Sequence, residues 1–176
     1  MLIPFTQPLD LTATLQSGQA FRWRREEPSG GCRETWFCGV VFGNVVRVRQ
    51  TPEGIEFRCA PDDESGFAPL LRDYMGLADN LQTVYRAIST DDHMREATHR
   101  YRGMRILRQE PWECLVSFIC SANSNIRRIS TNVEDLSDAF GSEVSLGGLR
   151  RNLFPSAQRL AEAGEGPLRE LGLGFR

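Results

Sequence analysis

The chain has 176 residues, a formal net charge of −2 at pH 7 and a hydrophobic fraction of 40%. This length and apolar content suffice for one domain with a true core, or for one domain and part of another. The near-neutral charge gives no argument for nucleic acid, the apolar runs are too short to cross a membrane, and the N-terminus lacks the pattern of a secretory signal peptide.

The cysteine and lysine content limits the possible chemistry. The five cysteines are odd in number and contain no C-x-x-C pair, which favours free thiols in a reducing compartment. They form no metal-binding pattern with the two histidines, His93 and His99. All 21 basic residues are arginine, so no lysine amine of this polypeptide can form a Schiff base with a sugar aldehyde.

The first part of the chain predicts an antiparallel sheet. Asp10 is expected to cap a short helical turn at 11–15, and Ser17 to Gln19 are expected to form a turn. Alternating segments predict about four strands, at 21–24, 35–42, 45–48 and 55–59, with Gly43 and Asn44 as a two-residue hairpin turn. The short connections indicate an antiparallel meander.

From Phe67 onward the hydrophobic period is that of helices. Predicted helices lie at 67–75, 81–88, from Asp91 onward, and at 111–122, 126–140, 156–163 and 167–171, with Gly141 as a C-cap. Residues 142–154 are glycine-rich and stay unassigned. Strands followed by helices predict the α+β class.

The stretch at 111–128, PWECLVSFICSANSNIRR, is the most distinctive part of the sequence. Its first part is apolar on nearly every side and predicts a fully buried helix. A small polar corner follows, and Asn125 is expected to N-cap the next helix, whose N-terminus can also bind phosphate. A rigid polar corner backed by arginines suits binding of a polar partner, although charge alone favours an ordinary solvated surface.

Three segments resemble the family of 8-oxoguanine DNA glycosylases: LDLTATLQSGQAFRWR at 9–24, PWECLVSFICSANSNIRRI at 111–129 and LRELGLGFR at 168–176. The resemblance implies an N-terminal antiparallel sheet domain like that of TATA-binding protein over 1–108. It implies the start of an all-α helix-hairpin-helix glycosylase domain over 109–176. Family members flip 8-oxoguanine out of the duplex, cut its glycosidic bond with a lysine and can then cleave the strand. The hairpin, the lysine and the catalytic aspartate have no match here. We therefore expect a truncated chain that cannot cleave alone, with these groups beyond Arg176.

The resemblance also implies roles for individual residues. Asn123 matches the residue inserted into the DNA gap, and Arg128 and Arg176 match arginines that contact the estranged cytosine. Phe175 matches a wedge residue that is usually tyrosine. Gly18 matches the glycine whose carbonyl bonds the N7–H that the lesion has and guanine lacks. The resemblance also implies that Asn125 is a DNA-binding residue. Without it, these positions would be a helix-end asparagine, surface arginines and a turn glycine.

The expected partner is double-stranded DNA with 8-oxoguanine opposite cytosine, bound by a monomer with no metal, cofactor or membrane. The expected compartment is intracellular, either a bacterial cytoplasm or a nucleus. Three alternatives stay open. The first is a non-catalytic damaged-DNA binding protein that ends at Arg176. The second is an alkylpurine glycosylase, whose cationic lesions need aromatic faces rather than an acceptor at Gly18. The third is an α+β scaffold whose corner only connects two helices.

Overall fold

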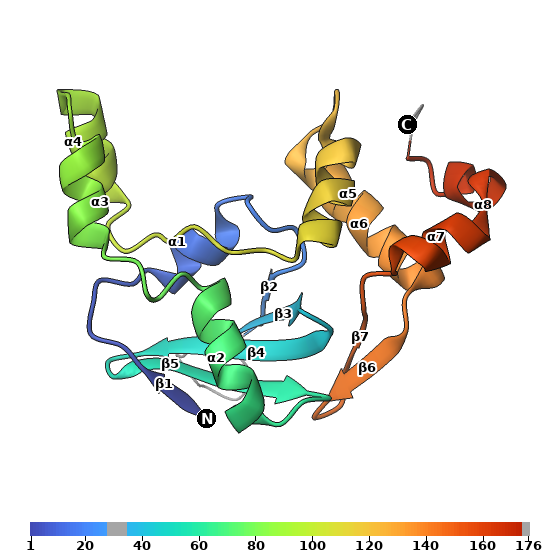
Figure 1. Cartoon of the computed structure of the whole chain (residues 1–176), viewed down its shortest axis with the longest axis horizontal. Helices are drawn as coiled ribbons and strands as arrows, with labels where there is room; N and C mark the ends of the chain where they lie inside the picture. Colours follow the sequence, from blue (N-terminus) through green and yellow to red (C-terminus); the bar gives the residue numbers. More distant parts are fainter. Residues whose placement is uncertain (28–34, 174–176) are drawn as a thin grey trace.

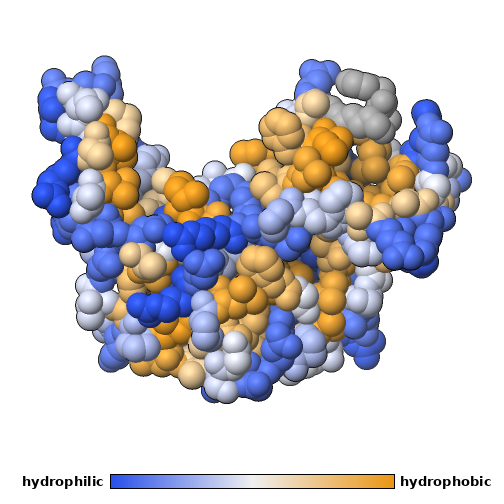
Figure 2. Space-filling model, in the orientation of Figure 1, coloured by the Kyte–Doolittle hydropathy of each residue, from blue (hydrophilic) through white to orange (hydrophobic). Residues whose placement is uncertain are grey.

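The computed structural model describes residues 1–27 and 35–173. An antiparallel sheet forms the base, and two groups of helices rise from it at opposite ends (Figure 1), with a concave surface between them in the space-filling view (Figure 2). The predicted α+β class is confirmed. None of the helices in these two ranges combines the length and apolar character needed to cross a membrane.

The sheet has five antiparallel strands in the order β1-β5-β4-β3-β2. The strands are β1 (Leu2–Pro4), β2 (Arg24–Arg25), β3 (Phe37–Val41), β4 (Asn44–Thr51) and β5 (Gly54–Ala60). In β4, Val46 and Val48 are fully buried, whereas Arg47 and Arg49 lie over the ring of Trp36 on the other face. This alternation is what a half-buried strand requires.

The hairpin between β3 and β4 turns one residue earlier than predicted. Val41 pairs with Asn44, so the turn residues are Phe42 and Gly43, with φ of 45° and 76°. Two positive φ values fit a tight hairpin turn of the primed type. Asn44 is instead a buried anchor, because its amide donates to Asp62 Oδ2 and its carbonyl oxygen accepts from the Asp62 amide, both at 2.9 Å.

The predicted strand at 21–24 is largely wrong, because only Arg24 and Arg25 pair with β3. Arg22 and Trp23 turn into the interior, where Trp23 Nε1 donates to the Tyr74 hydroxyl at 2.9 Å. The Trp23 ring lies against Gly39, where an added Cβ would lie 2.6 Å from it. The sequence analysis also missed β1, a three-residue edge strand that is too short to show alternation.

Helices α1 (Leu11–Gln16) and α2 (Glu64–Tyr74) belong with the sheet. The predicted cap is confirmed, since Asp10 accepts from the Ala13 amide at 2.8 Å. Helix α2 packs on the sheet through Phe67 and Leu71, and the rings of Phe57 and Phe67 lie 6.3 Å apart. This core fixes the sheet on which the rest of the chain is mounted.

The remaining elements are α3 (Leu81–Ile88), α4 (Asp92–Arg100), α5 (Pro111–Ser121), α6 (Ile126–Phe140), α7 (Ala157–Ala163) and α8 (Glu165–Glu170). The unassigned stretch at 142–154 contains a second hairpin, β6 (Glu143–Leu146) and β7 (Leu149–Asn152). A second hydrophobic cluster joins α5 to α6 through Val116, Cys120, Ile129, Val133 and Leu136. Cys38, Cys59 and Cys114 are free thiols, as predicted, and Cys32 lies outside the described residues.

Helix α5 is not fully buried, which corrects the prediction. Its face toward α6 is packed, but Leu115, Phe118 and Ile119 are exposed, Phe118 by 74%. No part of the described chain covers this side of the helix. Figure 2 shows hydrophobic surface on the two helical groups where they face each other across the concave side. The apolar character of α5 thus exceeds what the described residues can bury.

Candidate functional site

The corner between α5 and α6 is held by local hydrogen bonds. Helix α5 begins with Pro111 in its first turn and ends before Ala122. Asn123 then takes a left-handed conformation with φ of 53°, which asparagine tolerates better than most residues. The predicted cap at Asn125 is confirmed, because its side chain accepts from the Arg128 amide at 3.0 Å. Asn123 and Asn125 are both exposed, so this ordered corner presents two amides to solvent.

Gly18 lies directly against this corner. It has a φ of 83°, and an added Cβ would lie 2.9 Å from Cδ1 of Ile126, the first residue of α6. The next residue fixes the turn, because Gln19 Nε2 donates to the carbonyls of Thr14 and Arg105 at 3.0 and 2.9 Å. Glycine therefore meets two requirements here, the left-handed backbone and the close approach to α6.

The chain after Gly18 runs along one face of α6. Ser130 Oγ donates to the Phe21 carbonyl at 3.0 Å. Arg24 Nη2 donates to Ser130 Oγ and to Glu134 Oε1, both at 3.0 Å. Because Ser130 and Glu134 are four residues apart, they share a face of the helix. Ile126, which contacts Gly18, lies one turn earlier on the same face. The Gly18 turn and the helical corner thus form one packed unit.

Arg128 joins the third matched segment to the same corner. Its Nη2 donates to the carbonyl of Gly172 at 2.9 Å, and its side chain is otherwise exposed. Phe175 and Arg176 lie outside the described residues. The structure therefore brings together Gly18, Asn123 and Arg128, which come from segments far apart in the sequence.

A buried ionic group lies beneath this corner, and the sequence analysis missed it. Arg22 lies in the segment predicted as an alternating strand, and it is only 2% exposed. Arg22 Nη2 donates to the carbonyl of Asn152 and lies 3.5 Å from Glu134 Oε2. Arg22 Nη1 lies 3.9 Å from Glu113 Oε2. Burial lowers the pKa of Arg22 and raises the pKa of Glu113 to about 7.

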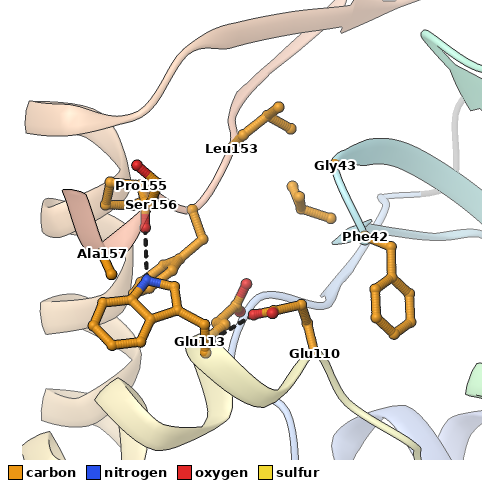
Figure 3. Close-up of a pocket in the computed structure, with 11 residues that line it drawn as sticks. Phe42, Gly43, Glu110, Glu113, Leu153, Pro155, Ser156 and Ala157 are labelled. Atoms are coloured by element: carbon orange, nitrogen blue, oxygen red, sulfur yellow. Dashed lines mark hydrogen bonds between the residues drawn. The ribbon is translucent and has the colours of Figure 1, made fainter. Parts of the chain in front are cut away.

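Glu113 also faces a cavity of about 610 Å³ between the sheet and the helices (Figure 3). The cavity is bounded by the β3–β4 turn, the start of α5 and residues 153–157. Trp112 Nε1 donates to the Pro155 carbonyl at 2.9 Å across one wall. In the ranges 1–27 and 35–173, no group of histidine, cysteine, aspartate and glutamate is arranged to hold a metal ion. The cavity therefore presents carboxyl chemistry and apolar walls.

The fold defines the class of protein, because it matches that of solved 8-oxoguanine glycosylases. A structure of MBOgg1 in complex with a low-affinity DNA ligand superposes with a TM-score of 0.87 and 29% identity over 99% of this chain and 57% of that chain. The 8-oxoguanine glycosylase/lyase of Clostridium acetobutylicum was solved with double-stranded DNA containing cytosine opposite 8-oxoG. It matches with a TM-score of 0.83 and 27% identity over 99% of this chain and 60% of that one.

The chain belongs to the family described as 8-oxoguanine DNA glycosylase, N-terminal domain, which matches residues 2–115. The N-glycosylase/DNA lyase OGG1 of Arabidopsis thaliana is 31% identical over 96% of this chain and 46% of that protein. The N-glycosylase/DNA lyase of Saccharomyces cerevisiae is 35% identical, with the same coverage of 96% and 46%. The family resemblance is confirmed, and the chain spans about half the length of these relatives.

Proposed function

We propose that this chain forms the lesion-recognition part of an 8-oxoguanine DNA glycosylase that acts in base-excision repair. The observation that carries this proposal is the meeting of Gly18, Asn123 and Arg128 at one ordered corner. Family membership supports it, as do relatives named N-glycosylase/DNA lyase. The substrate is duplex DNA with 8-oxoguanine opposite cytosine, like the duplex in the Clostridium acetobutylicum structure.

Each residue has a role that suits its chemistry. Extruding a base costs a few kcal/mol in lost stacking and pairing, and it leaves a gap beside an unpaired cytosine. The exposed Asn123 amide can donate and accept inside that gap. The Arg128 guanidinium has five N–H donors and uses one in the hydrogen bond to Gly172, so others remain for the cytosine edge. The Gly18 carbonyl accepts from the lesion N7–H, whereas guanine would place a lone pair there.

The same proposal assigns bond cleavage to groups outside this chain. With no lysine in the sequence, no side chain here can form the Schiff base of a lyase step. In the complete enzyme, a lysine nucleophile and an aspartate supply the glycosylase and AP lyase activities. We place the boundary between the sheet domain, 1–108, and the helical domain, 109–176. Two separate clusters support this boundary, since Leu107 packs in the first and Trp112 in the second.

Further parts of the proposal concern the assembly and the compartment. The protein acts as a monomer, with no cofactor, inside the cell, in a bacterial cytoplasm or a eukaryotic nucleus. The free thiols of Cys38, Cys59 and Cys114 support a reducing compartment. Phe175 and Arg176 complete the DNA-binding set with Asn125, whose helix N-terminus suits a phosphate.

Fluorescence anisotropy with three matched duplexes tests this function. We expect the chain to bind 8-oxoguanine:cytosine more tightly than guanine:cytosine, and more tightly than a duplex with an alkylated purine. Asn123→Ala and Arg128→Ala should each weaken lesion binding, whereas Arg159→Ala, an exposed arginine on α7, should not. Equal affinity for all three duplexes would refute the proposal, and a preference for the alkylpurine would favour the related glycosylase class. Borohydride should trap no covalent adduct on this chain.

A further inference from the structure

Four segments of the chain meet at the side chain of Arg22. We call this group the Arg22 junction: Arg22 from the segment after Gly18, Glu113 from α5, Glu134 from α6 and Asn152 from β7. Arg22 Nη2 reaches α6 and β7, and Nη1 faces α5. The junction thus links the segment that carries Gly18 to both helices of the corner.

The backbone of Arg22 is held as well as its side chain. Arg151 Nη2 lies 3.5 Å from the Arg22 carbonyl and donates to Glu134 Oε1 at 2.6 Å. Glu134 therefore accepts hydrogen bonds from both Arg22 and Arg151, and it is only 21% exposed. Arg22 lies four residues after Gly18, so a displacement of Arg22 is passed to the Gly18 carbonyl through a short piece of chain.

Stability alone does not account for a buried arginine at this place. Arg22 is 2% exposed, and its Nε and Nη1 atoms have no hydrogen-bond partner among the described residues. Burying an incompletely bonded charge is unfavourable, and apolar replacements of buried ion pairs are often neutral or stabilising. What the junction does provide is geometry, because it joins three elements to the Gly18 segment at one point.

Resting on the proposed function, we propose that Arg22 and Glu113 are positioning residues that fix the Gly18 carbonyl relative to the α5–α6 corner. Discrimination between lesion and guanine depends on one acceptor, and a hydrogen bond needs its heavy atoms within about 2.7–3.2 Å. A shift of the Gly18 turn by an ångström would lose this bond while leaving the general DNA contacts in place.

The junction is sensitive to pH through Glu113. Arg22 and Arg151 favour its ionised form, Glu110 and Glu134 oppose it, and burial opposes it most, so its pKa is raised to about 7. Figure 3 shows Glu113 beside the cavity, which gives protons access to the carboxyl group. Above neutral pH the carboxylate attracts Arg22, and below it the protonated acid does not. The Arg22 contact should therefore hold the Gly18 turn against local opening more firmly at pH 8 than at pH 6, whereas burial of the ionised carboxylate lowers the stability of the whole chain against unfolding at the higher pH.

Amide hydrogen exchange on the whole chain tests the junction without DNA. Arg22→Met should speed amide exchange at residues 18–22 by about tenfold or more. The reason is that local opening becomes easier by roughly the free energy of one hydrogen bond. Arg22→Lys, which keeps the charge, should restore part of the lost protection. Leu71→Ala, in the core under α2, is the control for a general loss of stability and should not loosen 18–22 selectively. Equal exchange at 18–22 in Arg22→Met and Leu71→Ala would overturn the proposal.

The pH dependence supplies a readout that a purely structural role would not change. In the wild-type chain, exchange at 18–22 by local opening, corrected for intrinsic rates and compared with exchange of core amides, should slow between pH 6 and pH 8. Glu113→Gln should remove this dependence, because an amide does not titrate in that range. A pH dependence that persists in Glu113→Gln would contradict the role of Glu113.

The ratio of the guanine:cytosine and 8-oxoguanine:cytosine dissociation constants links the junction to recognition. Arg22→Met should reduce this ratio by about tenfold with guanine:cytosine affinity unchanged, since one specific hydrogen bond is lost. A full wild-type ratio in Arg22→Met would overturn the positioning role. If the wild-type chain itself shows no preference, the proposed function fails. Hydrogen exchange then decides separately whether the junction holds the Gly18 turn.

Discussion

Replacing Gly18 by alanine tests the proposed role of the Gly18 turn most directly. The φ of 83° places an alanine in the left-handed region, which costs about 1–2 kcal/mol for a residue with a Cβ. The new Cβ would also lie 2.9 Å from Cδ1 of Ile126, closer than real Cβ contacts allow. Ile126 is 60% exposed, so a small shift of the turn together with the Ile126 side chain relieves the contact at little cost in stability. We therefore expect a stability loss of about 1–2 kcal/mol and a displaced Gly18 carbonyl.

Gly43 offers a matched control for the backbone strain. Its φ is 76°, but an added Cβ would meet nothing within 4 Å. Gly43→Ala should therefore lose about the same 1–2 kcal/mol in urea unfolding, with no effect on DNA binding. Gly18→Ala should lose its preference for 8-oxoguanine:cytosine over guanine:cytosine in the anisotropy assay. The comparison separates a strained turn from a displaced acceptor.

The double variant Gly18→Ala/Ile126→Ala removes the crowded side chain. If contact with Ile126 displaces the carbonyl, the double variant should recover much of the lesion preference while keeping the stability loss. The reasoning is refuted if Gly18→Ala keeps the full wild-type preference. It is also refuted if Gly43→Ala loses that preference to the same degree, because strain would then be the whole cause.

Three further predictions concern the corner and its surroundings. Asn125→Ala should lower stability by about 1 kcal/mol in urea unfolding, because α6 loses its cap, and an unchanged midpoint would contradict this. Phe118→Ser should change stability by less than about 0.5 kcal/mol and reduce binding of a hydrophobic dye, since this side chain is 74% exposed. The pKa of Glu113 is raised to about 7 from a usual 4.5, so the folded state holds the proton more tightly. Its contribution to stability is present below about pH 4.5 and is lost as pH rises through 7. Glu113→Gln should thus gain up to about 3 kcal/mol over the wild type at pH 8 and little at pH 5, and equal gains would refute the shift.

Local sequence signals predicted much of the helical corner. The cap residues Asp10 and Asn125 and the periods of α3 and α6 are set by neighbours within one or two turns, and they were placed well. The hairpin at 143–152 was missed because strands of four residues containing serine, arginine and asparagine show little hydrophobic alternation. Gly141 follows α6 as predicted, but with an extended backbone. An added Cβ there would lie 2.0 Å from the Leu153 carbonyl, so close packing requires the glycine.

Long-range contacts account for the larger errors. The ionic contacts of Arg22 were not predicted, because its partners, Glu113, Glu134 and Asn152, lie far along the chain and cannot be seen in a local pattern. The apolar composition of α5 predicted complete burial, but burial depends on which surfaces are present to cover it. The family resemblance identified Gly18, Asn123 and Arg128, whereas their meeting at one corner required the fold.

Helix α6 has a mechanical consequence for recognition. At 15 residues it is about 22 Å long, and one of its faces holds the chain from Gly18 to Arg24 while its first turn carries Arg128. Under the proposed function, the acceptor for the damaged base at Gly18 and the donor for the opposite cytosine at Arg128 are therefore both held by this one helix. Gly18 and Arg128 cannot shift independently, so α6 fixes the distance between them. Under the same proposal, duplex DNA is the partner that deforms, and a base pair is accepted when its two bases can be separated to match this fixed distance.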